Sequence, residues 1–87
     1  MTAVMYMAYD RIRELREDHD LRQVDVAQML KMSQTGYSKY ETGENDIPTS
    51  VLIALADFYG VSVDYLLGRT NKPEFHPEKK RVQNLLL

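Results

Sequence analysis

The 87-residue chain is 44% hydrophobic, carries a formal net charge of −2 and contains no cysteine. A chain of this length builds one small domain, and without cysteine it forms neither disulfides nor thiolate metal sites. Its start lacks the pattern of a signal peptide, and the longest apolar stretch, residues 51–56, is far too short to cross a bilayer. We therefore expect a small cytoplasmic protein with no membrane contact and no cofactor.

The charge is distributed unevenly along the chain. Residues 21–40 carry a net charge of +2, whereas residues 1–20 carry −2 and residues 41–70 carry −4. Proteins that bind nucleic acid place cations where they meet phosphate, so the second segment is the favoured region for such contacts. The negative total argues against a broadly basic binding surface.

Helical periodicity dominates the sequence, and no segment alternates with a period of two for long enough to predict a strand. The expected fold is all-α, with five helices in one compact domain. A first amphipathic helix covers about residues 6–18, and a second, shorter helix covers about residues 23–30. The residues assigned to the core, with no further role, are Val26, Ala27, Leu30, Leu52, Leu55, Leu66 and Leu67.

The third predicted helix, over residues 34–42, has recognisable signals at both ends. Ser33 is a good N-cap, because its hydroxyl can accept a hydrogen bond from a free backbone N–H of the first turn. Gly43 follows the last turn, at a position where glycine adopts a left-handed backbone most easily.

Two further helices complete the domain. Thr49 or Ser50 can cap a helix that ends at about Tyr59, and Ser62 can cap a short helix that stops at Gly68.

The composition changes after residue 70, where two prolines and a basic run appear. We therefore divide the chain into a folded unit at residues 1–70 and a C-terminal tail at residues 71–87. The tail is interpreted either as a dimerisation extension or as a disordered segment.

Residues 21–43 carry the functional signal. Two short predicted helices joined by about three residues describe a helix-turn-helix. In that motif the second helix lies in the major groove of DNA and its N-terminal side chains reach the base edges, while the first helix crosses the backbone.

Several short patterns, taken in order, resemble the lambda-repressor-like, Cro-type helix-turn-helix domains of the Xre family. The resemblance covers about residues 9–69. It rests on Leu21-x-Gln23, Val26-Ala27-x-x-Leu30, Ser38-Lys39-Tyr40-Glu41-x-Gly43, Pro48 and the run from Leu55 to Gly68. The resemblance implies a sequence-specific regulator of transcription, in particular a repressor, that binds double-stranded DNA at a near-palindromic operator as a homodimer.

The resemblance also assigns roles to individual residues. Gln23 matches a glutamine that holds a DNA phosphate at the start of the first motif helix. Gln34 and Thr35 occupy the first turn of the recognition helix, where a glutamine pairs with adenine and a threonine methyl suits thymine. Lys39, one turn further on, can donate to guanine or to a phosphate. The other candidates for DNA contact are Lys31, Ser33, Ser38, Tyr40 and Thr42.

Arg16 and Glu41 match an Arg–Glu pair that, in the family, ties the first helix to the end of the recognition helix.

Lys31 departs from the family pattern because it stands where glycine is favoured. Tyr37 replaces a smaller aliphatic residue, and its ring must be packed or partly exposed. Gly36, inside the recognition helix, costs about 1 kcal/mol relative to alanine, which a close approach to DNA would justify.

Other classes of function are weighed against this interpretation. The same fold serves antitoxins and accessory regulators whose main partner is another protein, and the acidic stretch after Glu41 offers such a surface. A structural domain without DNA binding is a further alternative. An enzyme is not predicted, because no catalytic grouping is visible, and His19 and His76 have no metal-ligand spacing.

Overall fold

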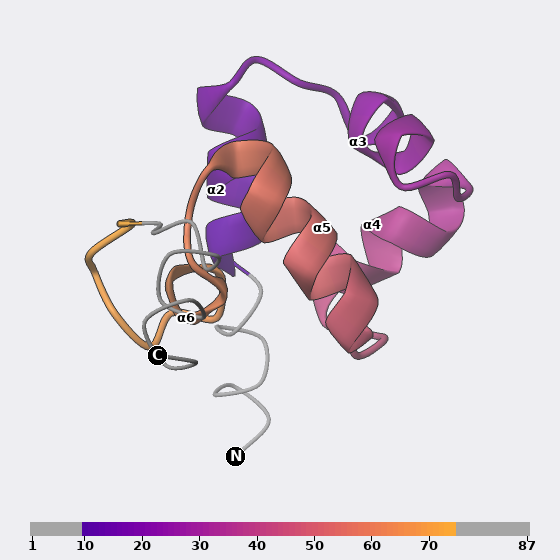
Figure 1. The fold of residues 1–87 in the computed structure, drawn as a ribbon. Coiled ribbons are helices and arrows are strands. Elements are labelled where there is room, and N and C mark those ends of the chain that lie inside the picture. Colours follow the sequence, from indigo (N-terminus) through magenta and orange to yellow (C-terminus); the bar gives the residue numbers. More distant parts are fainter. Residues whose placement is uncertain (1–9, 75–87) are drawn as a thin grey trace, which may run out of the picture.

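The computed structural model describes residues 10–74, and these residues form five α-helices and no strand. In chain order the helices are α2 (Asp10–Asp18), α3 (Gln23–Met29), α4 (Gln34–Thr42), α5 (Thr49–Tyr59) and α6 (Val63–Leu66). α3 packs against α4, α2 packs against both α4 and α6, and α5 packs against α6 (Figure 1). The predicted all-α fold is confirmed in this range. No helix in it is long and apolar enough to cross a membrane.

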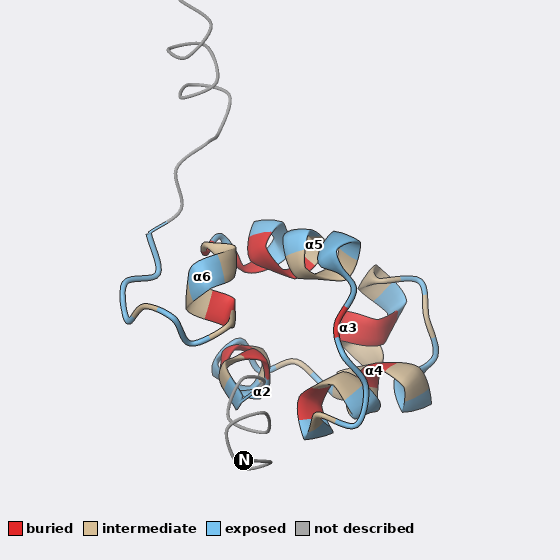
Figure 2. Cartoon of the chain, turned by 90° about the horizontal axis from the view of Figure 1, so that it is seen from below, coloured by how far each residue is buried: buried red, intermediate tan, exposed pale blue. Residues whose placement is uncertain are grey.

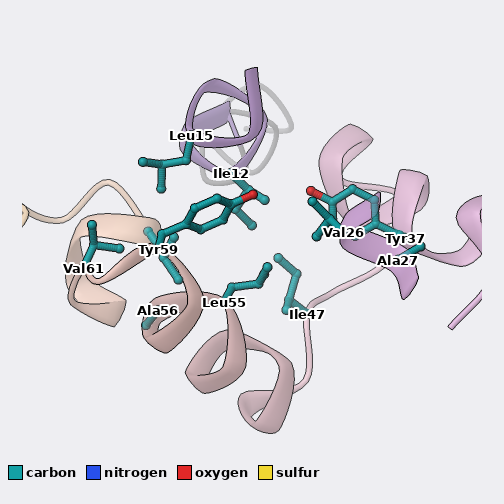
Figure 3. Packing of buried hydrophobic residues seen from close by; sticks show 11 residues of the cluster. Ile12, Leu15, Val26, Ala27, Tyr37, Ile47, Leu55, Ala56, Tyr59 and Val61 are labelled. Atoms are coloured by element: carbon teal, nitrogen blue, oxygen red, sulfur yellow. The ribbon is translucent and has the colours of Figure 1, made fainter. Parts of the chain in front are cut away.

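The helices turn their buried faces toward one shared core (Figure 2). Its members are Ile12, Leu15, Val26, Ala27, Tyr37, Ile47, Leu55, Ala56, Tyr59, Val61 and Leu66. The hydroxyl groups of Tyr37 and Tyr59 point toward one another across this core (Figure 3). The core therefore contains two polar atoms that need partners.

Three of the residues predicted as core are only half-buried: Leu30, Leu52 and Leu67. Leu30 and Leu67 are the C-caps of α3 and α6, where the chain leaves the helix and turns toward solvent. Leu30 and Leu52 still pack against the edge of the core.

The two serine caps lie where the sequence predicts them. Ser33 Oγ accepts a hydrogen bond of 3.0 Å from the Gly36 N–H, and Ser62 Oγ accepts one of 3.0 Å from the Tyr65 N–H. These bonds satisfy backbone donors that the first turn of each helix leaves free.

The predicted cap of α5 was wrong. Thr49 and Ser50 are its first two residues, and Pro48 is the N-cap, with φ −58° and ψ 150°. The Pro48 carbonyl accepts from the N–H groups of Val51 and Leu52, at 3.0 Å each. Proline holds φ in the range that a chain entering a helix needs. α5 starts at this proline and has no side-chain cap.

Some predicted boundaries shift or lie outside the described residues. The second helix ends at Met29, one residue earlier than expected. Residues 6–9 of the first predicted helix lie outside the described part, as does the tail beyond residue 74. The division at residue 70 and the two interpretations of the tail therefore stay predictions.

α6 is attached to α2 through Arg11. The guanidinium lies 4.0 Å from the centre of the Tyr65 ring, and Nη1 donates to the Tyr65 carbonyl at 3.2 Å. A cation over an aromatic face is an attractive arrangement. This contact covers one face of Tyr65 within the domain.

Candidate nucleic-acid interface

α4 presents one polar side to solvent and buries the adjoining side, which carries Tyr37 and Glu41. With about 100° of rotation per residue, five of the candidate residues fall within an arc of roughly 140° on the helix surface. They are Gln34, Thr35, Ser38, Lys39 and Thr42, and we call this arc the α4 polar face. Ser38 is half-buried and the other four are exposed.

Tyr40 does not belong to the α4 polar face, because it lies about 100° further round the helix than Lys39. Its half-buried ring packs beside Tyr37, with ring centroids 6.3 Å apart and planes nearly perpendicular. Part of the Tyr40 ring is therefore used in packing within the domain.

Two hydroxyl groups of the α4 polar face are engaged within the helix. Ser38 Oγ donates to the Thr35 carbonyl at 2.9 Å, and Thr42 Oγ1 lies 3.2 Å from two acceptors, the Lys39 carbonyl and Glu44 Oε1, that share its one proton. Each hydroxyl carries a single proton, so in this state both can only accept from a ligand. The amide of Gln34 and the ammonium group of Lys39 keep donors available.

The turn between α3 and α4 leaves little room beside Gly36. A Cβ on Gly36 would lie 3.1 Å from Met32 Cε and 3.2 Å from Ser33 Oγ. Both distances are closer than ordinary van der Waals contact. A side chain at this position would require Met32 and Ser33 to shift by a few tenths of an ångström.

Lys31 occupies the left-handed position that closes α3, with φ 59°. Its N–H donates to the Gln28 carbonyl at 3.0 Å, and the next N–H, from Met32, donates to the Ala27 carbonyl at 3.0 Å. This pair of bonds is the Schellman arrangement in which glycine is the usual residue. Lys31 is exposed at the turn, close in sequence to the start of α4.

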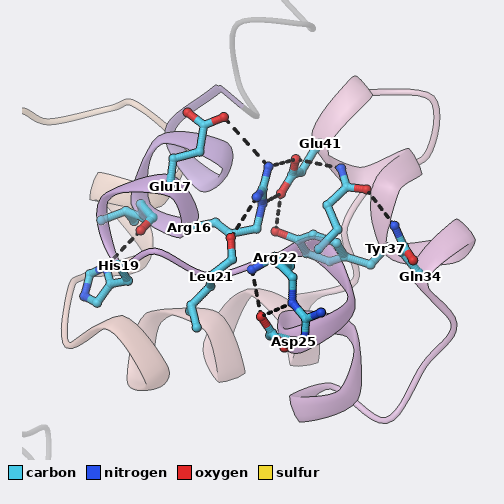
Figure 4. Close-up of polar contacts among 11 residues, drawn as sticks. Arg16, Glu17, His19, Leu21, Arg22, Asp25, Gln34, Tyr37 and Glu41 are labelled. Carbon is cyan, nitrogen blue, oxygen red and sulfur yellow. Dashed lines mark hydrogen bonds and ion pairs between the residues drawn. The ribbon is translucent and has the colours of Figure 1, made fainter.

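Gln23, the first residue of α3, connects the α4 polar face to the interior of the domain. Its Nε2 donates to Glu41 Oε1 at 3.1 Å, and its Oε1 accepts from Gln34 Nε2 at 3.5 Å, the long limit of a hydrogen bond. Figure 4 draws this series of bonds. The two glutamines expected to contact phosphate and base are therefore neighbours across the turn.

Glu41 is a buried carboxylate, 8% exposed, that receives donors from three helices. Arg16 of α2 donates from Nε to Oε2 at 2.7 Å and from Nη2 to Oε1 at 3.1 Å. Such bidentate pairing is the strongest geometry for arginine with a carboxylate. The Arg16–Glu41 pair implied by the family resemblance is confirmed. Arg16 Nη1 also donates to the Leu21 carbonyl at 2.9 Å, which holds the chain just before α3.

Tyr37 adds a donor to the same carboxylate from within α4. Its ring is fully buried, and its hydroxyl donates to Glu41 Oε2 at 2.6 Å. The sequence left open whether this ring is packed or partly exposed, and the structure shows that it is packed. Burial, together with the neighbouring carboxylate, raises the pKa of Tyr37 well above its usual range, so the hydroxyl stays protonated.

The Arg16–Glu41 pair is charged at neutral pH. Burial raises the pKa of Glu41, but hydrogen bonds from Arg16, Tyr37 and Gln23 outweigh this effect and leave the pKa below its ordinary value. The hydrogen bond to Glu41 raises the pKa of Arg16 in turn. An ionised carboxylate only accepts hydrogen bonds, so every group that faces Glu41 must be a donor.

Cations near the α4 polar face are few. Lys31 and Lys39 are exposed, and Arg22 precedes α3 with a side chain that is 78% exposed. The Arg22 guanidinium binds the Asp25 carboxylate at 2.8 and 3.1 Å, which offsets part of its charge. This surface therefore offers few charged donors and several neutral ones.

Sequence reasoning missed two features of this site: the Tyr37 hydroxyl as a donor and the bond from Gln23 to Glu41. The signal for the first was present, because Tyr37 and Glu41 stand four residues apart, on one side of α4. The second joins residues 18 positions apart and has no local signature.

Comparison with known proteins gives the class. The helix-turn-helix family model matches residues 12–66. The HTH-type transcriptional regulator YobD of Bacillus subtilis is 35% identical over 80 residues, which are 92% of this chain and 71% of that protein. The cryptic phage CTXphi transcriptional repressor RstR of Vibrio cholerae is 34% identical over 78 residues, 87% of this chain and 70% of that protein.

A solved structure shares the fold. The crystal structure of a transcriptional regulator from Listeria innocua matches with a TM-score of 0.68 at 26% identity, over 90% of this chain and 71% of that one. The chain belongs to the helix-turn-helix family. It is a DNA-binding regulator of transcription and not an enzyme.

Proposed function

We propose that this protein represses transcription by binding a near-palindromic operator as a homodimer, with α4 of each copy in the major groove. The observation that carries the proposal is the α4 polar face, which is held in place because the adjoining side of α4 is fixed in the core through Tyr37 and Glu41. Repression is favoured because RstR, 34% identical over 78 residues, is a transcriptional repressor. Such a role places the protein in the cytoplasm, where it meets DNA.

Gln34, Thr35 and Lys39 are the proposed base-reading residues. A glutamine amide pairs with the N6 and N7 atoms of adenine, a threonine methyl contacts the methyl group of thymine, and a lysine donates to guanine O6 and N7. Gln34 and Thr35 lie in the first turn of α4, which is the part of a recognition helix that enters the groove most deeply.

The remaining candidates are proposed to contact the DNA backbone. Gln23 and Lys31 lie at the start and just beyond the end of α3, beside the turn that leads into α4. The others, on or next to α4, are Ser33, Ser38, Tyr40 and Thr42. Contacts to phosphate and sugar fix the register of the protein on the duplex but carry no sequence information by themselves.

The proposed homodimer follows from size and from exposed apolar surface. A single module of this kind buries only about 600–1,000 Å² on DNA, whereas two copies read half-sites about 34–36 Å apart. On α5, Ile53 is 51% exposed and Phe58 is 46% exposed, and they are the large hydrophobic side chains left in solvent among residues 10–74. We propose that a second copy covers this part of α5. Tyr65 of α6 is half-buried and is a weaker candidate for such a contact, because Arg11 already covers one face of its ring.

Selection from a pool of random duplex DNA with the purified 87-residue chain, at stated salt, tests the proposed function. The expected result is an enriched sequence with two inverted half-sites whose centres lie about one helical turn apart. Sedimentation of the free protein and of an Ile53→Glu, Phe58→Glu variant tests the dimer, which the double substitution should dissociate. Failure to enrich any duplex over the starting pool would overturn the proposed function.

A further inference from the structure

The bonds that lead from Glu41 to Gln34 have a direction. Glu41 lies in the interior and Gln34 lies on the α4 polar face, and Gln23 joins them with bonds of 3.1 Å and 3.5 Å. A glutamine amide has a donor end and an acceptor end, and the two ends are nearly the same in shape. Which end faces which neighbour is therefore decided by hydrogen bonding and not by packing.

Glu41 settles this choice for Gln23. Because an ionised carboxylate only accepts, Gln23 must turn its NH2 group toward Glu41 and its carbonyl oxygen outward. That oxygen only accepts, so it selects the NH2 group of Gln34 as its partner. Gln34 is left with its carbonyl oxygen and one N–H for any group outside the protein.

The carboxylate that sets this order is itself held in one position. Arg16 binds both of its oxygens, and Tyr37 donates to Oε2 at 2.6 Å. Both donors are largely withdrawn from solvent: Tyr37 is fully buried, and the Arg16 side chain is 12% exposed. Glu41 therefore has neither the freedom to turn away from Gln23 nor, at neutral pH, the proton with which to donate to it.

We infer that Glu41 is a positioning residue that fixes the donor–acceptor polarity of Gln34 through Gln23, and thereby makes Gln34 select adenine over guanine. The inference rests on the proposed function, because Gln34 must reach a base edge. With this polarity, the free carbonyl oxygen faces the N6 amino group of adenine and the free N–H faces N7. Guanine presents O6 in place of the amino group, so two acceptors would oppose one another. A Gln34 amide released from Gln23 can rotate and donate both hydrogens to guanine O6 and N7.

The test uses the full chain and the duplex enriched by the wild-type protein. The position read by Gln34 is found as the one at which Gln34→Ala loses its preference, and its A·T pair is then replaced by G·C. The ratio of Kd values for the two duplexes is measured for the wild-type protein, Gln23→Met and Glu41→Gln. Glu17→Gln is the matched control, because Glu17 also faces Arg16, at 3.9 Å, but is exposed and does not contact Gln23.

We expect Gln23→Met and Glu41→Gln to lower the preference for adenine over guanine by about tenfold, since a bidentate base contact carries discrimination of this order. Glu17→Gln should keep the wild-type ratio. Should Glu41→Gln fail to fold, Gln23→Met decides alone, because it leaves the Arg16–Glu41 pair in place.

A ratio unchanged in Gln23→Met, with both duplexes bound more weakly to the same degree, would overturn the inference and leave the proposed function standing. If the wild-type protein enriches no duplex, or if Gln34→Ala keeps every base preference, the proposed function fails and the inference fails with it. A merely structural role for the cluster predicts loss of stability without a change in the ratio.

Discussion

Tyr37 and Glu41 lie one turn apart on the buried side of α4, and the tyrosine hydroxyl donates a hydrogen bond of 2.6 Å to the carboxylate. Glu41 also accepts from Arg16 of α2 and Gln23 of α3. One carboxylate therefore joins the recognition helix to the two helices that precede it. The position of α4, and with it the direction of its polar face, depends on this cluster.

Tyr37→Phe should destabilise the protein by about 1.5–3 kcal/mol, the range for a hydrogen bond to a charged group. The ring stays in place, so the loss reports on the hydroxyl alone. Urea unfolding at neutral pH measures it. Tyr59→Phe is the matched control, because Tyr59 Oη is buried and has no hydrogen-bond partner among the described residues. We expect that control to be neutral or stabilising, and equal losses in the two variants would contradict the account.

Acid should weaken the fold through Glu41. Folding lowers the pKa of Glu41 below its ordinary 4.5, so as the pH falls the unfolded chain takes up this proton before the folded protein does. The stabilisation is complete above about pH 4.5 and is lost as the pH falls through the folded-state pKa. Unfolding in urea at neutral pH and at about pH 3 measures this loss.

Glu41→Gln supplies the comparison for acid. This variant lacks the carboxylate, so it should start from a lower stability at neutral pH and lose less of it as the pH falls. Arg16, Tyr37 and Tyr59 also face Glu41, but none of them titrates in this range. Parallel pH dependence in the wild-type protein and the variant would show that other carboxylates govern acid unfolding.

Alkali should weaken the fold through the two buried tyrosines. Burial raises the pKa of Tyr59 to about 12, while an unfolded tyrosine ionises near 10.0. The unfolded chain therefore releases its proton first, and stability falls as the pH rises from about 10 toward 12. Tyr59→Phe removes this share of the loss, and urea unfolding at about pH 11 measures the difference. An identical alkaline decline in both proteins would rule out the role of Tyr59.

Local hydrogen bonding explains what could be predicted from sequence. The bounds of α4, its Ser33 cap and the Ser62 cap were predicted correctly, because a cap joins residues three positions apart. The start of α5 at Pro48 was not predicted. At this N-cap the backbone carbonyl accepts from the first-turn N–H groups, and no side chain does.

Tertiary contacts explain what could not be predicted. The family pattern has an aliphatic residue at the position of Tyr37, and only the fold shows that the core has room to bury the whole ring. The bond between Gln23 and Glu41 likewise depends on how α3 packs against α4. The α4 polar face follows from helical periodicity, but the polarity of its amides does not.

Lys31→Gly should stabilise the protein by about 1 kcal/mol, because φ 59° carries a steric cost for a residue with a Cβ. If the ammonium group contacts phosphate, the same change should make the salt dependence of DNA binding shallower by about one unit of slope. Asp20→Gly is the matched control, since Asp20 closes α2 with φ 57°. It should add a smaller gain in stability and leave the salt slope unchanged. If Lys31→Gly keeps the wild-type salt dependence of DNA binding, Lys31 does not contact phosphate.

The central claim is that the α4 polar face reads bases. Its most direct test is the affinity of wild-type protein and Gln34→Ala for the enriched operator with each base pair changed in turn. Gln34→Ala should lose about 1–3 kcal/mol and flatten the preference at one position in each half-site. Gln23→Ala should weaken binding to every sequence and lower the base preference only at the position that Gln34 reads. If Gln34→Ala keeps the wild-type preference at every position, α4 does not face the groove as proposed.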